Sequence, residues 1–420
     1  MRLCVVLAAA LFAGTAFAQP RPGPVFADAT ATHIPAAPDL HALDAVFGDF
    51  DRDGDLDAAL AVEYGANRLY LNDGKGKLRW VEGALGRTVH DSEHVRTADF
   101  DGDGLLDLVF VAEDGANHQL FLGRAGGRFE EVSDRLPANS EGNALAVGDV
   151  NGDKLPDIVV GNSAENGGVA RNFLWLNDPA RRGFFLDASA NLPTPAGDEA
   201  QSIALADFDK DGDLDMVIAN QSPTNRLLLN DGKGRFSDAT ARLERSVPTQ
   251  TREVQILDAN RDGRLDILFF NITSNAGAYD RDPQARLLIQ QADGRFRDET
   301  KVRQPQHSFS AWGGQVIDFD QDGATDIVIG AVQVPGFVPM QLRAWRNDGQ
   351  GRFTDVTLAA MPNSVIGRNW SMAVGDLDGD KRDDLLVGAW GTQARLLLTD
   401  RAPVLAAQAR PKLGQPEPGR

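Results

Sequence analysis

Seven acidic nonapeptides in this sequence have the spacing of a site for a hard cation. In the clearest copy, an aspartate stands at every odd position from Asp207 to Asp215. Carboxylates at positions 1, 3, 5 and 9, with a backbone carbonyl at position 7, can surround calcium, which takes six to eight oxygens at about 2.3–2.6 Å. Carboxylates packed so closely repel one another unless a cation lies between them. The spacing therefore predicts calcium binding.

Successive copies of the nonapeptide start 50, 50, 58, 51, 60 and 58 residues apart. Acids or amides occupy positions 1, 3, 5 and 9 in every copy, and position 7 supplies a backbone carbonyl whatever its side chain. Self-similarity at such a period is typical of propellers and other repeat arrays. The predicted metal ligands are, copy by copy, Asp49, Asp51, Asp53, Asp55 and Asp57; Asp99, Asp101, Asp103, Leu105 and Asp107; Asp149, Asn151, Asp153, Leu155 and Asp157; Asp207, Asp209, Asp211, Asp213 and Asp215; Asp258, Asn260, Asp262, Arg264 and Asp266; Asp318, Asp320, Asp322, Ala324 and Asp326; and Asp376, Asp378, Asp380, Arg382 and Asp384.

Position 6 of the loop is expected to need a left-handed backbone turn, which glycine adopts freely. Five copies have glycine there, but the third and seventh copies have Lys154 and Lys381. A side chain in this conformation costs on the order of 1 kcal/mol, although glycine at position 4 of both copies (Gly152 and Gly379) relieves strain. We therefore expect five to seven calcium ions, with the third and seventh loops the weakest.

Each repeat surrounds its acidic loop with the pattern of four short strands. An apolar stretch such as 144–148 leads into the loop, and a β-branched run such as 157–161 leaves it. A third apolar run, an Asn-Asp-Gly-Lys-Gly turn and a fourth run follow, as in 226–240. Such runs between turns of Gly and Asn indicate β-strands. Seven repeats of this kind predict an all-β fold, a seven-bladed β-propeller of four-stranded antiparallel blades.

The two ends of the repeat array predict how the ring closes. The fourth-strand pattern Arg-Phe-x-Asp-x-Thr recurs along the chain, but the seventh repeat stops before it, at 395–398. A matching stretch, Val-Phe-Ala-Asp-Ala-Thr, stands at 25–30. We expect this N-terminal strand to complete the last blade, so that the propeller covers 24–400. Residues 401–420, rich in Ala, Pro and Arg, are expected to form a disordered tail.

Residues 1–18 have the pattern of a secretory signal peptide: Arg2, then an apolar run, then a small-x-small cleavage site at Ala16–Ala18. The run is too short to span a membrane. The only cysteine, Cys4, would leave with this leader, so the mature chain would form no disulfides. We expect a secreted or periplasmic protein without a transmembrane segment.

The composition, with 42% hydrophobic and 25% charged residues, is that of a globular protein. The net charge of −19 comes mostly from the acidic loops, and bound divalent ions would largely neutralise it. This acidity argues against nucleic acid or an anionic membrane as a partner, and we expect a monomer.

The seventh repeat, Met372 to Asp380 followed by 384–389, resembles the FG-GAP or VCBS repeat. Such repeats form the propeller of integrin α chains, whose calcium loops are similar to these. The resemblance covers about 24–400 and implies an integrin-α-like propeller with calcium loops. It implies no single function, because propellers of this kind serve adhesion molecules, lectins and some polysaccharide lyases.

The longest connections between predicted strands should share the face opposite the acidic loops: 85–94, 162–172, 271–285, 302–313 and 332–341. Long loops on a rigid scaffold usually carry binding. Aromatic side chains gather there, and flat rings suit stacking on sugars, although they could instead pack the blade rims. The predicted ligand-binding residues are Trp312, Trp370, Trp390, Tyr279, Phe337, Arg368 and His307.

No catalytic constellation stands out, so the first hypothesis is a binding or adhesion module for a glycan or an exported protein. The alternatives are a polysaccharide lyase that uses His, Tyr or Arg on the loop face, or a purely structural or envelope-associated interaction protein. His90 and His94 have a spacing that could hold zinc, but solvated loop histidines are the commoner case.

Overall fold

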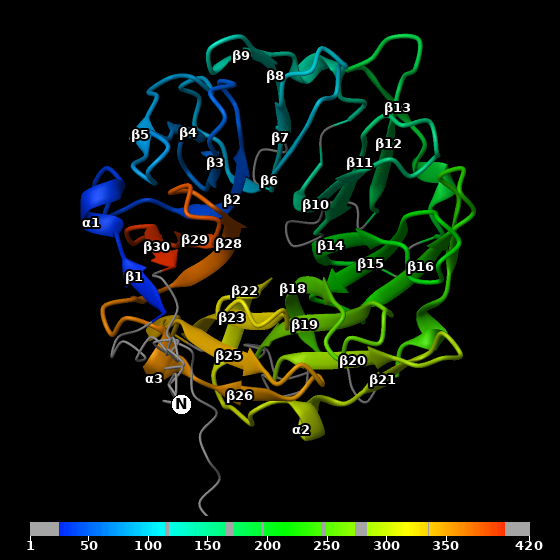
Figure 1. Ribbon diagram of the computed structural model, residues 1–420. Coiled ribbons are helices and arrows are strands. Elements are labelled where there is room, and N and C mark those ends of the chain that lie inside the picture. Colours follow the sequence, from blue (N-terminus) through cyan, green and yellow to red (C-terminus); the bar gives the residue numbers. More distant parts are fainter. Residues whose placement is uncertain are drawn as a thin grey trace, which may run out of the picture.

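The computed structural model describes residues 25–113, 117–138, 140–163, 171–194, 197–244, 249–273, 284–334 and 336–399. Seven antiparallel sheets stand around a central axis, and four strands of each follow one another outward from the axis (Figure 1). One sheet has two further strands. The seven-bladed β-propeller expected from the repeats is thereby confirmed. The leader at 1–18 and the tail at 401–420 lie outside the described residues. Within the described part, no helix has the length and apolar character needed to cross a bilayer.

Apart from β1, the strands follow one another blade by blade along the chain. Blades one to three contain β2 (Ala42–Gly48), β3 (Asp57–Val62), β4 (Arg68–Leu71) and β5 (Arg79–Trp80); β6 (Ser92–Ala98), β7 (Asp107–Ala112), β8 (Gln119–Arg124) and β9 (Arg128–Glu131); and β10 (Gly142–Gly148), β11 (Asp157–Asn162), β12 (Phe173–Asn177) and β13 (Phe185–Asp187). Blades four and five contain β14 (Ala200–Ala206), β15 (Asp215–Asn220), β16 (Arg226–Asn230) and β17 (Phe236–Asp238); and β18 (Gln250–Leu257), β19 (Asp266–Ile272), β20 (Arg286–Gln290) and β21 (Phe296–Asp298). Blade six contains β22 (Ser310–Ile317), β23 (Asp326–Gln333), β25 (Arg343–Asn347) and β26 (Phe353–Asp355), with β24 (Val338–Gln341) and β27 (Ile366–Gly367) as an added pair. Blade seven contains β28 (Asn369–Gly375), β29 (Asp384–Ala389), β30 (Arg395–Thr399) and β1 (Phe26–Asp28).

A single helical turn follows the fourth strand in six blades: α1 (Thr30–His33), η1 (Ser133–Arg135), η2 (Ser189–Asn191), η3 (Thr240–Arg242), α2 (Thr300–Arg303) and α3 (Thr357–Ala360). The Asp-x-Thr motif explains it in four blades, and serine replaces threonine in blades two and three. In blade five, Asp298 accepts a hydrogen bond from the amide of Thr300 at 3.0 Å, and the hydroxyl of Thr300 accepts one from the amide of Leu287 at 2.9 Å. The motif thus ends the fourth strand and binds it to the third strand.

The N-terminal strand closes the ring. β1 pairs antiparallel with β30, with Phe26 opposite Thr399 and Asp28 opposite Leu397. Val25 and Phe26 are completely buried, and the ring of Phe26 packs edge-on against Phe319 of blade six with the centroids 5.9 Å apart. The expected latch is therefore present, and blade seven combines the two ends of the array.

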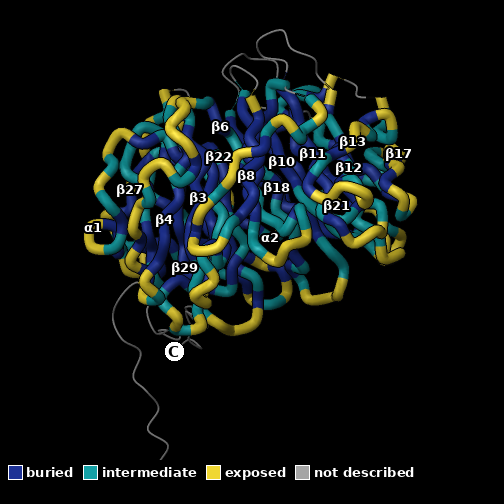
Figure 2. The backbone as a smooth tube through the Cα atoms, turned by 90° about the horizontal axis from the view of Figure 1, so that it is seen from above, coloured by how far each residue is buried: buried dark blue, intermediate teal, exposed yellow. Residues whose placement is uncertain are grey.

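The core of the protein lies between neighbouring blades. One cluster joins Val159 and Leu174 of blade three to Met216 and Leu228 of blade four, and similar clusters join other neighbouring blades. The second strand of each blade is buried almost throughout, as the dark interior of Figure 2 shows. Because this core lies between neighbouring blades, each blade can carry loops at both ends without disturbing it.

Every innermost strand runs toward an acidic loop, which connects it to the second strand. The first residues of these innermost strands and the last residues of the second strands therefore lie at the opposite face. The structure thus separates the acidic loops from the face that holds most of the predicted aromatic residues.

Candidate functional site

The acidic loops share one backbone conformation. Position 6 has a positive φ in all seven loops, from 67° at Lys154 and 69° at Lys381 to 98° at Gly54 and Gly212. Position 4 is left-handed as well, which the sequence did not indicate: φ is 67° at Arg52, 63° at Lys210 and 57° at Gln321. Each loop has glycine at one or both of these positions, and the loops with lysine at position 6 have glycine at position 4.

Six of the seven loops, all but the first, wrap around the carboxylate at position 1. In the fourth loop, Asp207 accepts hydrogen bonds from the amides of Asp211 at 3.2 Å and Gly212 at 3.1 Å. The corresponding bonds recur at Asp149, Asp258, Asp318 and Asp376. The left-handed residues turn these amides inward, so the loop geometry is set before any ion binds.

The aspartate at position 9 also ties the loop to its blade. In the fourth loop, the buried carboxylate of Asp215 accepts hydrogen bonds from the amides of Phe208 at 3.0 Å and Asn230 at 2.9 Å, so it spans the loop and the third strand. Its counterparts accept the same third-strand bond from the amides of Asn72, Gly123, Asn177, Gln290, Asn347 and Thr399. Position 9 is therefore a structural anchor.

Carboxylate oxygens converge in several loops. Oxygens from positions 1, 3 and 9 lie within 4.8 Å of one another in the second, fourth and sixth loops, and oxygens of Asp49, Asp51 and Asp53 do so in the first. Burial and the neighbouring aspartates raise the pKa of Asp107 to about 7 and that of Asp326 to about 8. A set of hard oxygen donors whose ionisation is this unfavourable fits a divalent cation such as calcium.

Arginine side chains enter some loops, which the sequence did not show. In the sixth loop, the guanidinium of Arg346 lies 2.5 Å from Asp320 and 2.9 Å from Asp322. In the second loop, Arg124 lies 3.4 Å from both Asp101 and Asp103. A guanidinium bound to these carboxylates competes with a metal ion for them.

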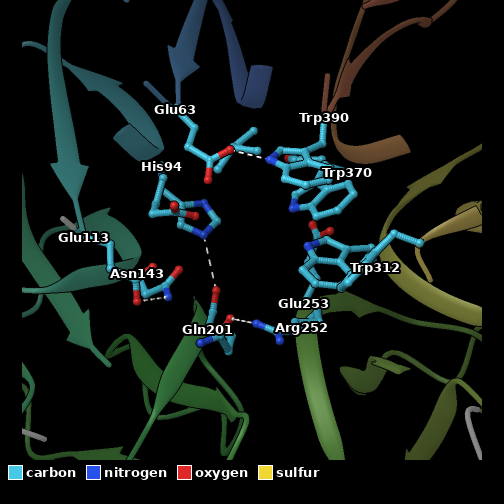
Figure 3. Close-up of a pocket in the computed structure, with 14 residues that line it drawn as sticks. Glu63, His94, Glu113, Asn143, Gln201, Arg252, Glu253, Trp312, Trp370 and Trp390 are labelled. Atoms are coloured by element: carbon cyan, nitrogen blue, oxygen red, sulfur yellow. Dashed lines mark hydrogen bonds between the residues drawn. The ribbon is translucent and has the colours of Figure 1, made fainter. Parts of the chain in front are cut away.

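A second site lies at the opposite face, at the mouth of the central channel, where a cavity of about 300 Å³ opens between the innermost strands (Figure 3). Each innermost strand has a β-bulge near its start, where its pairing with the second strand shifts register. Bulges re-aim side chains and are frequent beside active sites. The bulged residues, one or two from each blade, all line the cavity: Leu43, Glu93, Asn143, Gln201, Arg252, Trp312, Trp370 and Ser371.

Aromatic rings form one wall of the cavity. The ring centroids of Trp312 and Trp370 are 4.1 Å apart, and those of Trp370 and Trp390 are 5.8 Å apart. Phe337 packs against all three, with centroid distances of 5.4–6.3 Å. All four rings are partly exposed to the cavity. This wall is a continuous aromatic surface from blades six and seven.

Polar and acidic groups form the other side, as Figure 3 shows for Glu63, His94 and Glu113. Glu113 accepts hydrogen bonds from the side chains of Asn143 at 2.9 Å and Ser163 at 2.5 Å. Burial, together with the charges of Glu113, Asp91 and Glu63, raises the pKa of Glu93 well above its usual range. The carboxylate side is therefore electrostatically unfavourable in the absence of a cation.

The buried carboxylate of Asp44 holds three blades together beneath the cavity. It accepts hydrogen bonds from Ser371 of blade seven at 2.6 Å and from Arg96 and His94 of blade two at 2.6 and 3.0 Å. Burial opposes its ionisation, but Arg96 and His94 hold the pKa of Asp44 well below its usual range.

His94 is fixed by two acceptors. Its Nδ1 faces Asp44, and its Nε2 lies 3.2 Å from the carbonyl oxygen of Gln201. Both ring nitrogens thus have a partner, one in blade one and the other in blade four. The structure therefore gives His94 a bridging role and leaves neither nitrogen free for the zinc pair with His90.

The repeat pattern of this chain matches a known family in four places. Residues 49–110, 99–160, 207–269 and 336–387 match the FG-GAP-like repeat, and together these segments cover more than half of the chain. The chain belongs to the FG-GAP-like repeat family. The resemblance seen in the sequence is thereby confirmed.

Relatives of this FG-GAP protein include cartilage acidic protein 1 of Xenopus tropicalis, 33% identical over 198 residues, and that of Homo sapiens, 31% identical over 195 residues. The match covers 45% of this chain but only 28% of the length of either relative. Among solved structures, BBS1N in complex with ARL6DN aligns over 90% of this chain and 98% of that one with a TM-score of 0.55 at 11% identity, which shows the shared fold alone. Family and relatives point to a module of the binding type.

The predicted ligand-binding residues of this FG-GAP propeller separate into groups. Trp312, Trp370, Trp390 and Phe337 come together in the cavity wall. Arg368 lies behind the wall, with its guanidinium carbon 5.0 Å from the centroid of the Trp390 ring and its Nε donating to the carbonyl of Phe337.

Two other predicted residues are not part of the described cavity. His307 stacks on Phe309 with the centroids 4.0 Å apart, and it lies against the buried Trp345. It therefore packs between the fifth and sixth blades. Tyr279 lies outside the described residues.

Sequence reasoning missed the polar half of the cavity, which includes Glu63, Glu93, Glu113, Gln201 and Arg252. A signal was available, because one bulged residue of each blade stands six positions before its acidic loop. The side-chain type differs from blade to blade at this position, so neither composition nor a motif search reveals the ring.

Proposed function

We propose that this chain is an exported, calcium-stabilised β-propeller that acts as a binding module and takes a sugar unit of a glycan into the cavity at the channel mouth. The observation that carries the proposal is the ring of bulges, which aims side chains from all seven blades into one cavity with a tryptophan wall. Its volume, about 300 Å³, is at the lower end of the range for small-ligand sites.

The chemistry of the walls favours a sugar. Apolar faces of pyranose rings stack on aromatic rings, while hydroxyl groups need fixed hydrogen-bond partners. The cavity offers the indoles of Trp312, Trp370 and Trp390 on one side, with Gln201 and Asn143 among the polar groups on the other. An exported protein ligand would contact the same rim, but a concave cavity of this size suits a compact unit.

The acidic loops have a separate task in this proposal. They lie at the face opposite the cavity, and their carboxylates would hold calcium, with the aspartate at position 9 linking each ion site to its blade. Calcium would neutralise the loops and keep the ends of the innermost strands fixed. Its removal is expected to weaken ligand binding only through the stability of the scaffold.

Binding to a panel of immobilised glycans and polysaccharides in calcium tests the proposal. Trp312→Ala, Trp370→Ala and Trp390→Ala should each abolish binding of any hit while the fold and the calcium content stay intact. Trp390→Ala should also lower the melting temperature, because it removes the hydrogen bond to Glu63. Trp80→Ala is the matched control, because Trp80 is an exposed tryptophan of outer strand β5 and is not among the residues that line the cavity. Binding that survives all three cavity substitutions would contradict the proposal.

One observation favours the lyase alternative. Glu253 lines the cavity, and its burial raises its pKa to about 7. Hydrogen bonds from the amide of Gly314 and the side chain of Gln255 lower this pKa but do not outweigh the effect of burial. A carboxylate poised near neutral pH is suited to general base catalysis. Loss of viscosity when a bound polysaccharide is incubated with the protein, absent for Glu253→Gln, would support this alternative.

A further inference from the structure

The acidic side of the cavity has an excess of negative charge. Carboxylate oxygens of Glu63, Asp91 and Glu93 lie within 4.8 Å of one another, and Glu113 stands close enough to act on Glu93. Arg252 also lines the cavity, but its guanidinium lies over the Trp312 ring of the opposite wall and donates to the side chain of Gln201. A bound cation would relieve the repulsion among these carboxylates.

The aromatic wall already holds two cations. The guanidinium carbon of Arg252 lies 4.4 Å from the centroid of the Trp312 ring, and that of Arg368 lies 5.0 Å from the centroid of Trp390. Trp370 stands between these two tryptophans in the stack and faces the cavity. Indole faces attract cations through the quadrupole of the ring, and Arg252 and Arg368 already lie over Trp312 and Trp390. We therefore assign Trp370 as the ring on which a ligand stacks.

Gln201 adds a donor for an uncharged group. Its side chain lines the cavity, the residue is only 6% exposed, and its Nε2 has no hydrogen-bond partner among the described residues. Its Oε1 accepts a hydrogen bond from Arg252, which fixes the amide. A buried donor without a partner is unfavourable, and an oxygen of a ligand would supply the missing acceptor.

We propose, building on the glycan-binding function above, that the unit entering this cavity is a cationic amino sugar, a hexosamine with a free, protonated amino group. The apolar face of the pyranose stacks on Trp370, the ammonium group binds among Glu93, Glu63 and Glu113, and a hydroxyl oxygen accepts a hydrogen bond from Gln201. No single wall specifies this ligand. The specificity comes from the combination of the two walls and Gln201, because a neutral sugar brings no positive charge to the acidic side and a simple amine brings no oxygen to Gln201.

The raised pKa of Glu93 gives the proposal a pH dependence. The groups that face Glu93 are Glu63 after β3, Asp91 before β6, Glu113 after β7 and Arg252 of β18. An ammonium group stabilises the ionised form of Glu93, so binding releases a proton from the fraction of molecules in which Glu93 is protonated. Affinity is therefore expected to rise with pH for as long as the amine keeps its proton.

The test compares three oligosaccharides of equal length by calorimetry in calcium: glucosamine oligomers, N-acetylglucosamine oligomers and glucose oligomers. The glucosamine oligomer should bind at least 10-fold more tightly than either of the others. Equal or tighter binding of an uncharged oligomer would overturn this inference and leave the glycan-binding function intact. If no oligosaccharide binds, in this comparison or on the wider glycan panel, both proposals fail.

Glu93→Gln provides the second measurement. The variant should lose the preference for glucosamine over N-acetylglucosamine oligomers while its melting temperature stays at or above that of the parent protein, because a repulsive charge is removed. Glu82→Gln is the matched control and should keep the preference, because Glu82 is an exposed glutamate that pairs with Arg87 at 3.5 Å and is not among the described residues that line the cavity. If Glu93→Gln instead lowers the number of bound metal ions and leaves the preference unchanged, the carboxylates form a metal site and the inference is wrong.

Discussion

The indole Nε1 of Trp390 donates a hydrogen bond to the carboxylate of Glu63, a residue 327 positions earlier in the chain. Glu63 follows the second strand of blade one, and Trp390 follows that of blade seven. The bond therefore joins the acidic side of the cavity to its aromatic wall at the place where the ring closes. The imidazole of His41 lies 2.9 Å from the same carboxylate oxygen.

Trp390→Phe keeps an aromatic ring in the wall but removes the donor to Glu63. Loss of one hydrogen bond to a charged group is expected to lower the free energy of unfolding by about 1.5–3 kcal/mol, which chemical denaturation would measure. In the background of Glu63→Gln the same substitution should cost less, because the charged acceptor is already gone. Equal costs in the two backgrounds would show that the bond contributes nothing.

Removing calcium should destabilise the propeller strongly. Extracellular calcium sites have dissociation constants of about 10⁻⁴–10⁻³ M, so at roughly 1 mM free calcium one site contributes about 0.4–1.4 kcal/mol. Seven such sites would contribute about 3–10 kcal/mol, which is comparable with the net stability of a domain. The melting temperature should fall in excess chelator and recover with calcium, and elemental analysis should find five to seven ions. An unchanged melting curve in chelator would contradict the metal assignment.

Lys154→Gly tests the strain in the third loop. Lys154 has a φ of 67°, a conformation that glycine adopts at no steric cost. The substitution is expected to raise the free energy of unfolding in calcium by up to about 1 kcal/mol and to remove an ammonium group that competes with the ion. Lys233→Gly is a suitable comparison, because Lys233 lies in a turn outside the acidic loops and does not have a positive φ. A loss of stability in the Lys154 variant would show that its side chain supports the loop.

Deleting 19–31 should expose the edge of β30, because β1 pairs with that strand and buries Phe26. An unpaired strand edge invites association, so the truncated protein should melt earlier and aggregate in light scattering. Deleting 401–420, which lies beyond β30, should leave both measurements unchanged. If the two truncated proteins behave alike, the N-terminal strand is not the latch.

The buried carboxylate of Asp44 should make the protein sensitive to acid. Burial and the charge of the nearby Glu253 raise the pKa of Asp44, but Arg96 and His94 outweigh them and hold it below the ordinary 3.8. The ionised group therefore contributes stability above about pH 4, and this contribution is lost as the pH falls below that value. Asp44→Asn should cost about 3 kcal/mol at neutral pH by leaving Arg96 without its buried counter-charge. Between pH 4 and 2, the free energy of unfolding of the Asp44→Asn variant should fall less steeply than that of the parent protein. Chemical denaturation at each pH would measure the difference.

The sequence by itself determined the number of blades, the position of each acidic loop and the latch at the N-terminus. These features depend on short segments whose residue types repeat, such as the nonapeptide ending at Asp215 and the Asp-x-Thr turn at Thr300. A blade is a local unit that packs only against its neighbours, so a local pattern is enough to specify it. For the same reason, the pairing of β1 with β30 followed from one displaced copy of the fourth-strand motif.

Only the tertiary structure decided which side chains meet. Glu93, Gln201, Arg252 and Trp370 share a place in the repeat but no residue type, and they become neighbours only when the ring brings the innermost strands to one axis. The bond between Trp390 and Glu63 likewise spans almost the whole chain. Closure of the ring brings equivalent positions of different blades, far apart in sequence, together around one cavity. The chemistry of this cavity depends on contacts between blades, and no single repeat contains such contacts.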